Sequence, residues 1–359
     1  MVTEEMIKQL PKVELHDHLD GGLKPETILE LAAQEGVELP ASTPEALADW
    51  FHRGADRKNL GLYLEGFAHT VAVMQTRDNL RRVAREHMHS LLADNVVYGE
   101  IRFAPILHVE KGLNLEEVVK SVLEGLEEGR RETGVEFGLI LCAMRHQNVS
   151  LDIAELAVAF RTKGVVGFDI AGDEFGHPPK KHLDAFQYIQ NRNFNITIHA
   201  GEAFGVESIW QAVQICGAHR IGHATRLTED MVIHGTRIER MGTLSSYIRD
   251  KRIPMEICLS SNVQTGAAED LDRHPFHAYY RNNFRVLLCT DNRLMSNTTL
   301  AKEMGIAVGH YGLTLRDLEK LTINAMKSAF INYDERIRLI YDVLKPRFAK
   351  LRETTDPNI

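Results

Sequence analysis

Hydrophobic and polar positions along the chain form two kinds of pattern, one typical of buried strands and one typical of amphipathic helices. Short apolar runs rich in β-branched residues recur eight times, and longer segments with helical periodicity lie between them. The runs are KVELHDH (12–18), VVYGEIRFAP (96–105), EFGLILCAM (136–144), VVGFDIAG (165–172), FNITIHAGE (194–202), RIGHAT (220–225), IPMEICLSS (253–261) and RVLLCTDN (285–292). Eight strands that alternate with helices predict an α/β fold of the (β/α)8 TIM-barrel type.

The helical segments carry residues that commonly begin and end helices. Asp78 is expected to open the helix DNLRRVAREHMHSLL, and Asn114 with Glu117 predicts a capping box before a helix that stops near Gly134. The rival architecture is a doubly wound open sheet, but no G-x-G-x-x-G motif follows the first strand and no Walker motif occurs. The barrel is therefore the favoured fold.

The interval between the first two strands, residues 19–95, is longer than a plain βα unit requires. It holds KPETILELAAQEG, with Pro25 in a first helical turn and Gly36 as a stop, and then LGLYLEGFAHTVAVMQ. Extra helices here are expected over the C-terminal mouth of the barrel, where barrel enzymes keep their sites. Residues 40–75 are equally compatible with a moving lid and with extra packing.

The chain ends in two further helical patterns, LRDLEKLTINAMKSAFI and DERIRLIYDVLKPRFAKL, which we expect to be the last barrel helix and a closing helix. No repeat, low-complexity tract or linker interrupts the pattern. Residues 1–359 are therefore predicted to form a single domain.

Composition and charge narrow the choice of partners. The chain has 44% hydrophobic and 26% charged residues and a formal net charge of −8, so it offers no basic field for nucleic acid. Its four cysteines are far apart and lie in apolar contexts, which favours buried reduced thiols. No signal peptide or membrane span is apparent. We expect a cytoplasmic protein without a membrane partner, and its oligomeric state stays open.

Residues capable of chemistry stand at the ends of the predicted strands. His16 and His18 lie two apart in the first strand and therefore point to the same, interior face. His199, His223 and Asp291 end the fifth, sixth and eighth strands. A single buried histidine is more often a hydrogen-bonded core residue, but several imidazoles and a carboxylate at one barrel mouth predict a zinc-type metal site with room for a water.

Three more residues have both a functional and a plain structural interpretation. Glu202 lies just beyond His199, and a shielded carboxyl there has a raised pKa and can donate a proton; without the neighbouring His199, an N-cap or a surface residue before the next helix would be the preferred interpretation. Gly172 can let backbone N–H groups approach a ligand or simply form a turn. Asp20 can cap a helix or bind a ligand hydroxyl.

The other histidines show no shared convergence. His87 and His89 diverge because two residues correspond to about 200° of helix rotation, and we interpret them as surface and core-edge residues. We assign no chemistry to His52, His69, His108, His146, His177, His182, His219, His234, His274, His277 and His310.

Together these motifs resemble the adenosine deaminase family of metal-dependent amidohydrolases. VELHDHLDGGLKPETI, DIAGDE, IHAGE, RIGHATRL and LLCTDN occur in the family's order and approximate spacing, from residue 11 to about residue 300. The bacterial branch looks closest. The resemblance implies hydrolysis of adenosine, and of 2′-deoxyadenosine, to inosine or deoxyinosine and ammonia, by attack of zinc-bound hydroxide on purine C6.

The resemblance also implies roles for individual residues. Glu202 would protonate the purine N1, and His223 would position the metal-bound water and take part in its deprotonation. Gly172 would bind N3 through its backbone, and Asp20 would bind the ribose 5′-hydroxyl. One zinc ion per chain would be held by His16, His18, His199 and Asp291. By analogy with the lid helix of animal members, the ribose would be covered by Leu60, Tyr63, Leu64 and Phe67.

One residue departs from the family pattern. Animal members of the family carry a second Asp at the position of Asn292, and in those members the Asp contacts the purine N7. Since N7 only accepts hydrogen bonds, a carboxyl must be protonated to serve it, whereas an amide donates at any pH. Asn292 is therefore compatible with purine binding.

Other activities stay open at this stage. Deaminases of adenine or of modified adenosines share the metal motifs but commonly show Glu in HLEG, where this chain has Asp20. A non-catalytic barrel that binds nucleosides is a remote alternative, although every expected ligand and Glu202 are present. The cytidine-deaminase pattern H-x-E followed by P-C-x-x-C is missing from the sequence.

Overall fold

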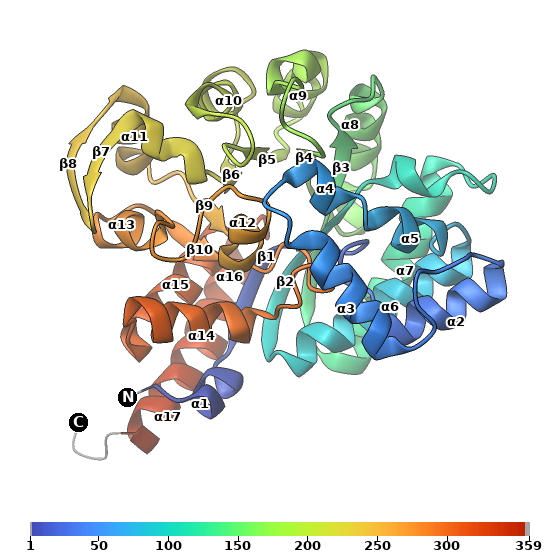
Figure 1. The fold of residues 1–359 in the computed structure, drawn as a ribbon, viewed down its shortest axis with the longest axis horizontal. Coiled ribbons are helices and arrows are strands. Elements are labelled where there is room, and N and C mark those ends of the chain that lie inside the picture. Colours follow the sequence, from blue (N-terminus) through green and yellow to red (C-terminus); the bar gives the residue numbers. More distant parts are fainter. Residues whose placement is uncertain (1, 356–359) are drawn as a thin grey trace.

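The computed structural model describes residues 2–355 and contains eight parallel strands in the order β1-β2-β3-β4-β5-β6-β9-β10. Helices lie between and outside them (Figure 1). The barrel strands are β1 (Lys12–His18), β2 (Val96–Phe103), β3 (Glu136–Met144), β4 (Val165–Ala171), β5 (Asn195–Ala200), β6 (Arg220–His223), β9 (Met255–Ile257) and β10 (Val286–Leu288). All eight coincide with the apolar runs predicted to be strands, so the predicted (β/α)8 barrel is confirmed.

The helices follow the chain in three groups. Those before β4 are α1 (Glu4–Gln9), α2 (Pro25–Glu35), α3 (Pro44–Ala55), α4 (Leu60–Leu64), α5 (Phe67–Ala72), α6 (Arg77–Ala93), α7 (Leu115–Thr133) and α8 (Ser150–Ala159). Those between β4 and β10 are α9 (Leu183–Asn191), α10 (Val206–Trp210), α11 (Thr243–Asp250), α12 (Leu259–Gln264) and α13 (Phe276–Arg281). The last are α14 (Leu300–Tyr311), α15 (Leu315–Ser328), α16 (Tyr333–Arg338) and α17 (Lys345–Thr355).

Short 3₁₀ and π turns connect several of these elements: η1 (Pro105–His108), η2 (Arg161–Lys163), η3 (Pro179–His182), η4 (Gln211–Ile215), η5 (Thr225–Asp230) and η6 (Leu339–Leu344). A two-stranded antiparallel hairpin, β7 (Met231–His234) and β8 (Arg237–Met241), stands outside the barrel sheet. This hairpin was not predicted from the sequence, because its alternation of apolar and polar residues is short.

The barrel closes between its first and last strands through a single bridge. Asp17 pairs with Asp291 in parallel, the His18 amide donates to the Asp291 carbonyl at 2.8 Å, and the Asp291 amide donates to the His16 carbonyl at 2.8 Å. Closure of the sheet therefore places the end of β10 directly beside the two histidines of β1.

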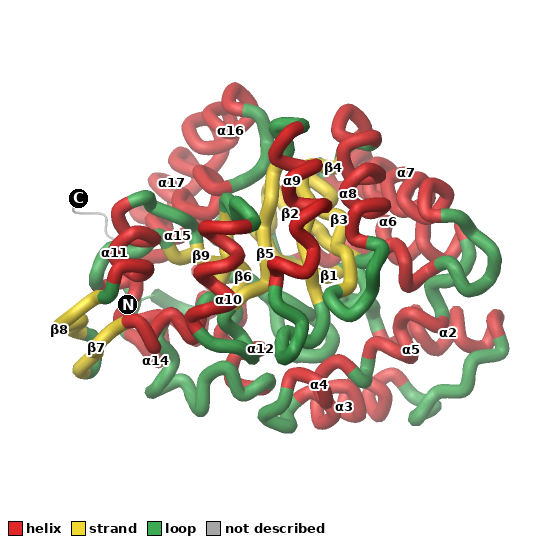
Figure 2. The backbone as a smooth tube through the Cα atoms, turned by 90° about the horizontal axis from the view of Figure 1, so that it is seen from above, coloured by secondary structure: helices red, strands yellow, loops and turns green. Residues whose placement is uncertain are grey.

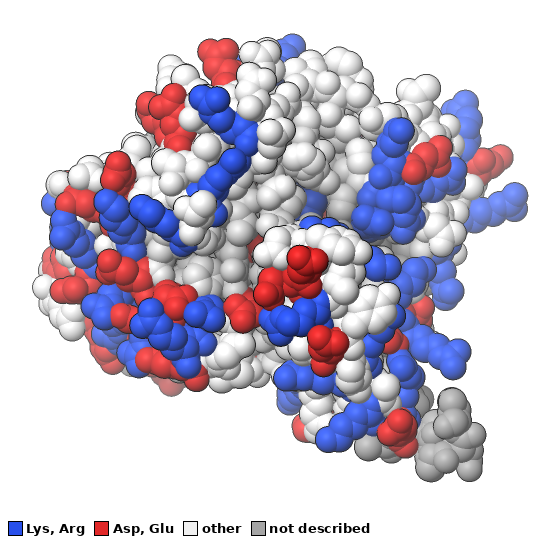
Figure 3. Space-filling model, turned by 180° about the vertical axis from the view of Figure 1, so that it is seen from behind, with Lys and Arg blue, Asp and Glu red and all other residues white. Residues whose placement is uncertain are grey.

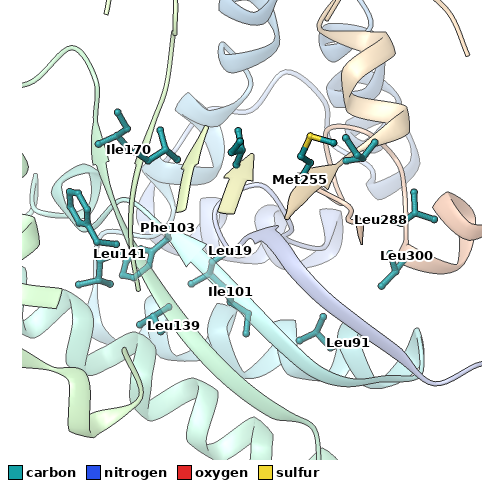
Figure 4. Close-up of a cluster of buried hydrophobic side chains, with 14 of the residues drawn as sticks. Leu19, Leu91, Ile101, Phe103, Leu139, Leu141, Ile170, Met255, Leu288 and Leu300 are labelled. Atoms are coloured by element: carbon teal, nitrogen blue, oxygen red, sulfur yellow. The ribbon is translucent and has the colours of Figure 1, made fainter. Parts of the chain in front are cut away.

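The interior contains an apolar core around the sheet and a network of charged residues inside the barrel. Apolar side chains pack between the strands and the surrounding helices; Figure 4 shows Ile101, Phe103 and Leu141 among them. Inside the barrel, Arg102 donates to Asp169 at 2.8 Å and to Glu256 at 2.9 Å, and none of the three is exposed. Because buried charges are costly unless paired and hydrogen-bonded, this network is expected to fix side-chain positions beneath the mouth.

Most of the few helix ends that local sequence signals predicted are confirmed. Pro25 starts α2, Gly36 ends it in the left-handed conformation, and the predicted capping box of Asn114 and Glu117 begins α7. The prediction for α6 was wrong by two residues. Thr76 is its N-cap and accepts from the Asn79 amide, while Asp78 lies within the first turn and complements the helix dipole there.

The long insertion between β1 and β2 forms the helices α2–α5, which lie at one end of the barrel (Figure 2). On the face drawn in Figure 3, acidic and basic side chains are interspersed and form no continuous basic surface. All four cysteines are buried and free, as predicted. Within residues 2–355, none of the helices is both long and apolar enough to cross a membrane.

Candidate active site

A cavity of about 480 Å³ opens at the carboxyl ends of the strands, under α4 and α5. This volume is typical of a small-molecule site. Of the residues predicted to bind metal or substrate, only His16 lies behind the wall; those that line the cavity are His18, Asp20, Leu60, Tyr63, Leu64, Phe67, Gly172, His199, Glu202, His223, Asp291 and Asn292. The fold thus brings the whole predicted set to one place.

The imidazoles of β1 and β5 converge on the Asp291 carboxylate. His16 Nε2 and His18 Nε2 each lie 3.4 Å from Asp291 Oδ1, and His18 Nε2 lies 3.2 Å from His199 Nε2. Two ring nitrogens that face each other at this distance in a buried site need either a shared proton or a shared cation. Burial lowers the pKa of His18 to about 3 and also lowers that of His199, which disfavours protonation.

Carboxylates behind the rings orient two of them. His16 Nδ1 lies 2.8 Å from Glu256 Oε2, and His199 Nδ1 lies 2.9 Å from Asp169 Oδ2. Metal-binding histidines commonly donate their outer N–H to a carboxylate in this way, which leaves Nε2 bare for the metal. His16 Nε2 is buried and has no hydrogen-bond partner. The residues present therefore fit a metal ion bound by nitrogen and one carboxylate oxygen.

His223 also belongs to this cluster. The ligand atoms of His16, His199, His223 and Asp291 all lie within 4.8 Å of one another. This tight group contains His223 in place of the predicted ligand His18. Distance alone does not separate the two, because His18 Nε2 is itself in contact with His199 and Asp291. His223 differs in that its other ring nitrogen, Nδ1, lies 2.9 Å from the Asn262 side-chain amide.

Glu202 faces His223 across the cavity. Its Oε2 lies 3.5 Å from His223 Nε2, and its Oε1 is buried without a hydrogen-bond partner. Burial, and then the negative charges of Asp291 and Glu174, raise the pKa of Glu202 to about 8. Glu202 is therefore a protonated acid near neutral pH, able to donate to a ligand atom.

The loop that carries Glu202 is held by one carboxylate. Glu174, beyond the end of β4, accepts from the Gly201 amide at 2.7 Å through Oε1. Its Oε2 accepts from the amides of Glu202, Ala203 and Phe204 at 2.9, 2.7 and 2.9 Å. Four charge-assisted bonds from consecutive residues fix the backbone that carries Glu202.

The two strand ends that carry His223 and Asp291 have unusual backbones. His223 has φ +67° and Asp291 has φ +64°, in the left-handed region that residues other than glycine rarely adopt. Ser261 donates to Asp291 Oδ2 at 2.6 Å and so leaves Oδ1 toward the histidines. Such strain commonly marks functional positions, since the surrounding structure must hold it in place.

The residues predicted to contact substrate surround this cluster. Asp20 Oδ1 is buried without a partner, and Gly172 has φ +98°. A Cβ on Gly21 would come within 2.0 Å of Asn292 Oδ1, so Gly21 allows the Asn292 amide to lie against the backbone of the first βα loop. Tyr63 bonds to Ser296 at 2.9 Å between hydroxyls and thereby fixes α4 to the mouth.

Several residues of the site were missed by sequence reasoning. Asp169 and Glu256 are single acidic residues inside the apolar runs VVGFDIAG and IPMEICLSS. A charged residue in a buried strand is unusual, and this could have indicated a role in the site. His146 lines the cavity and Ser261 orients Asp291, but nothing in their sequence contexts distinguishes them. Glu174 lies in the motif DIAGDE, but no separate role was predicted for it.

Comparison with known proteins gives a consistent result. A family model described as adenosine deaminase matches residues 11–346. The chain is 52% identical over 356 residues to adenosine deaminase 1 of Streptomyces coelicolor, which covers 98% of this chain and 90% of that protein. It is also 52% identical over 353 residues to adenosine deaminase of Mycobacterium leprae, covering 97% of this chain and 98% of that one.

Solved structures share the architecture. The adenine deaminase of Arthrobacter aurescens superposes with a TM-score of 0.85 at 23% identity, covering 96% of this chain and 99% of that chain. The ADAL–IMP complex superposes with a TM-score of 0.81 at 28% identity, with the same coverage. At 23% identity the first likeness shows only a common fold.

The barrel, with histidines and an aspartate gathered at its C-terminal mouth, defines a metal-dependent hydrolase of the amidohydrolase type. The family match spans nearly the whole chain, and the relatives described above are identical at about half of their positions. The chain belongs to the adenosine deaminase family.

Proposed function

We propose that this protein hydrolyses adenosine, and 2′-deoxyadenosine, to inosine or deoxyinosine and ammonia, with one zinc ion per chain. The observation that carries the proposal is the convergence of three imidazoles and Asp291 opposite Glu202, a buried acid kept protonated near neutral pH. Nitrogen ligands with one carboxylate suit zinc. The ligands would be His16, His18, His199 and Asp291. When bound, zinc supplies the acidity that makes hydroxide available from water near pH 7.

The side chains of the cavity would prepare the purine for attack. Glu202 gives its proton to N1, which draws electron density from C6 and makes that carbon a better electrophile. Hydroxide would then add to C6. The C6–N6 bond would break as the added hydroxyl passes its proton to the amino group, which leaves as ammonia, while C6 becomes a carbonyl and N1 keeps its proton. His223 holds the attacking oxygen, Gly172 donates its amide to N3, and Asn292 donates to N7.

The walls of the cavity favour a nucleoside over a nucleotide. Among the described residues, its lining contains the carboxylates of Asp20, Asp173 and Asp291, the protonated acid Glu202, and neither Lys nor Arg. A phosphate would meet repulsion there, because phosphate sites usually provide Arg, Lys or helix N-termini. A free 5′-hydroxyl, in contrast, can donate to the unpartnered Oδ1 of Asp20.

The ribose also separates adenosine from free adenine. α4 and α5 place the apolar residues Leu60, Leu64 and Phe67 in the cavity wall, beside Tyr63. This apolar wall is proposed to cover the sugar, which adenine lacks. Adenine would leave that space filled with water and would bind more weakly.

Metal analysis combined with turnover tests this proposal. The purified protein is expected to contain one zinc per chain, to lose conversion of adenosine to inosine after chelation, and to regain it when zinc is added. A protein that binds no zinc and stays inactive after zinc addition would contradict the proposal and would favour a nucleoside-binding barrel without catalysis.

A further inference from the structure

A line of hydrogen bonds runs behind His223, away from the cavity. The Asn262 amide nitrogen lies 2.9 Å from His223 Nδ1, and its oxygen lies 3.2 Å from His274 Nε2. His274 Nδ1 accepts from the backbone N–H of Phe276 at 3.0 Å. Asn262 on α12 and His274 before α13 are both buried, and neither was assigned chemistry from the sequence.

The donor and acceptor roles along this line are set by the hydrogen bond at its far end. The Phe276 amide can only donate, so His274 Nδ1 must be the accepting nitrogen. Burial lowers the pKa of His274 to about 3, so its ring is neutral and its single proton is on Nε2. That proton points at Asn262 Oδ1, and Asn262 therefore presents its NH₂ group to His223 Nδ1.

We propose that Asn262 and His274 are positioning residues that hold His223 in the tautomer with its proton on Nε2, facing the cavity. The proposal rests on the function assigned above to His223. Nδ1 of His223 accepts from Asn262, so in the neutral ring the proton is on Nε2, 3.5 Å from Glu202 Oε2.

This tautomer decides what His223 can do. An imidazole nitrogen that carries a proton has no lone pair for a metal, so His223 is excluded as a ligand although it lies within the tight group. His16 and His199 have the opposite arrangement, with carboxylates at Nδ1 and bare Nε2 atoms. His223 instead donates a hydrogen bond to the attacking oxygen, and it can accept a proton at Nε2 only after it has released the one already there.

Asn262→Asp is the sharpest perturbation. A carboxylate has no proton to offer His223 Nδ1 but readily accepts one, so the variant should move the proton of His223 from Nε2 to Nδ1. A wrong histidine tautomer costs about 10⁴-fold in kcat in the Ser-His-Asp triad, and here we expect a loss of roughly 10²–10⁴-fold. Zinc content and KM for adenosine should stay close to wild type, because neither the ligands nor the cavity wall change.

Tautomers can be read without turnover by long-range ¹H–¹⁵N correlation on zinc-loaded protein with ¹⁵N-labelled histidine, with His223 assigned from His223→Gln. The expected pattern is a protonated Nε2 in wild type and a protonated Nδ1 in Asn262→Asp. Gln264→Glu is the matched control, since it adds the same charge to α12 outside this line of bonds and should keep kcat near wild type.

A wild-type His223 protonated on Nδ1, an Asn262→Asp variant with wild-type kcat, or equal losses in Asn262→Asp and Gln264→Glu would each overturn the proposal. A wild-type protein with protonated Nε2 but no turnover of adenosine would support the tautomer assignment and contradict the function. The two failures are therefore distinguishable.

Discussion

At the scale of single residues, the cavity keeps two buried carboxyl groups in opposite states. Burial raises the pKa of Glu202, whereas Asp291 is held well below its usual pKa because the close contact with His16 and the other nearby histidines outweighs its own burial. Environments that raise the pKa of one acid and lower the pKa of its neighbour commonly separate a proton donor from a group that stays charged. The residue types were readable from the sequence, but their burial and partners were not.

Glu202→Gln tests the proton donor. The variant should keep its zinc and lose about 10²-fold or more of kcat, since general acid catalysis commonly contributes 10²–10⁴-fold. In wild type, activity should fall as pH rises through the raised pKa of Glu202, near 8, because the protonated form is needed. That high-pH fall should disappear in the variant. Turnover near the wild-type rate would exclude Glu202 as the donor.

Asn292→Asp tests the residue proposed to bind N7. The new carboxyl serves N7 only while it is protonated, so KM for adenosine should rise as pH rises and the carboxyl ionises, while wild type should show no such trend. KM measured from about pH 4, near the ordinary pKa of an aspartate, up to about pH 8 gives the comparison. A KM that changes equally at every pH would mean that Asn292 does not face N7.

At the scale of elements, loops and helix ends carry the site, and the strands only place them. The strand ends were predicted because apolar runs stop at His199, His223 and Asp291. The hydrogen bonds from the backbone N–H groups of residues 201–204 to Glu174 were not predictable. They join residues far apart in sequence, and because every residue type here offers the same backbone donor, the side-chain pattern does not indicate them.

Glu174→Gln should loosen the loop that carries Glu202. An amide offers one accepting oxygen and turns its NH₂ group toward backbone donors, so we expect a loss of about 2–3 kcal/mol in unfolding free energy, in line with hydrogen bonds to charged groups. kcat should fall while zinc content stays unchanged. Urea denaturation and metal analysis measure both effects. Exposed Glu207 on α10 provides the control, and a Glu174→Gln variant as stable and active as Glu207→Gln would refute the role of Glu174.

The helices α4 and α5 offer a matched pair of variants. Phe67 lines the cavity, whereas Leu62 on α4 is 36% exposed and does not. Phe67→Ala should raise KM for adenosine with little change in kcat, because the ring is proposed to cover the ribose and to take no part in the chemistry. Leu62→Ala should leave both constants unchanged. Equal effects in the two variants would favour packing over ribose contact as the role of these helices.

At the scale of the whole molecule, closure of the barrel brings together the residues of the proposed metal site. The Asp17–Asp291 bridge brings the last strand to the first, so that proposed ligands about 270 residues apart in sequence meet at 3.4 Å. The eightfold alternation predicted this architecture, because a barrel is the arrangement that pairs every parallel strand. The charged layer of Arg102, Asp169 and Glu256 beneath the mouth was not predicted, since pattern analysis expects apolar residues there.

Ammonia release from adenosine, adenine and AMP by one zinc-loaded preparation tests the central claim most directly. If α4 and α5 cover the ribose and Asp20 binds a free 5′-hydroxyl as proposed, adenosine should have the highest kcat/KM, since the described lining also contains neither Lys nor Arg for a phosphate. Adenine loses the ribose contacts, and AMP adds a phosphate opposite carboxylates. Faster turnover of adenine or AMP than of adenosine would contradict the proposed substrate.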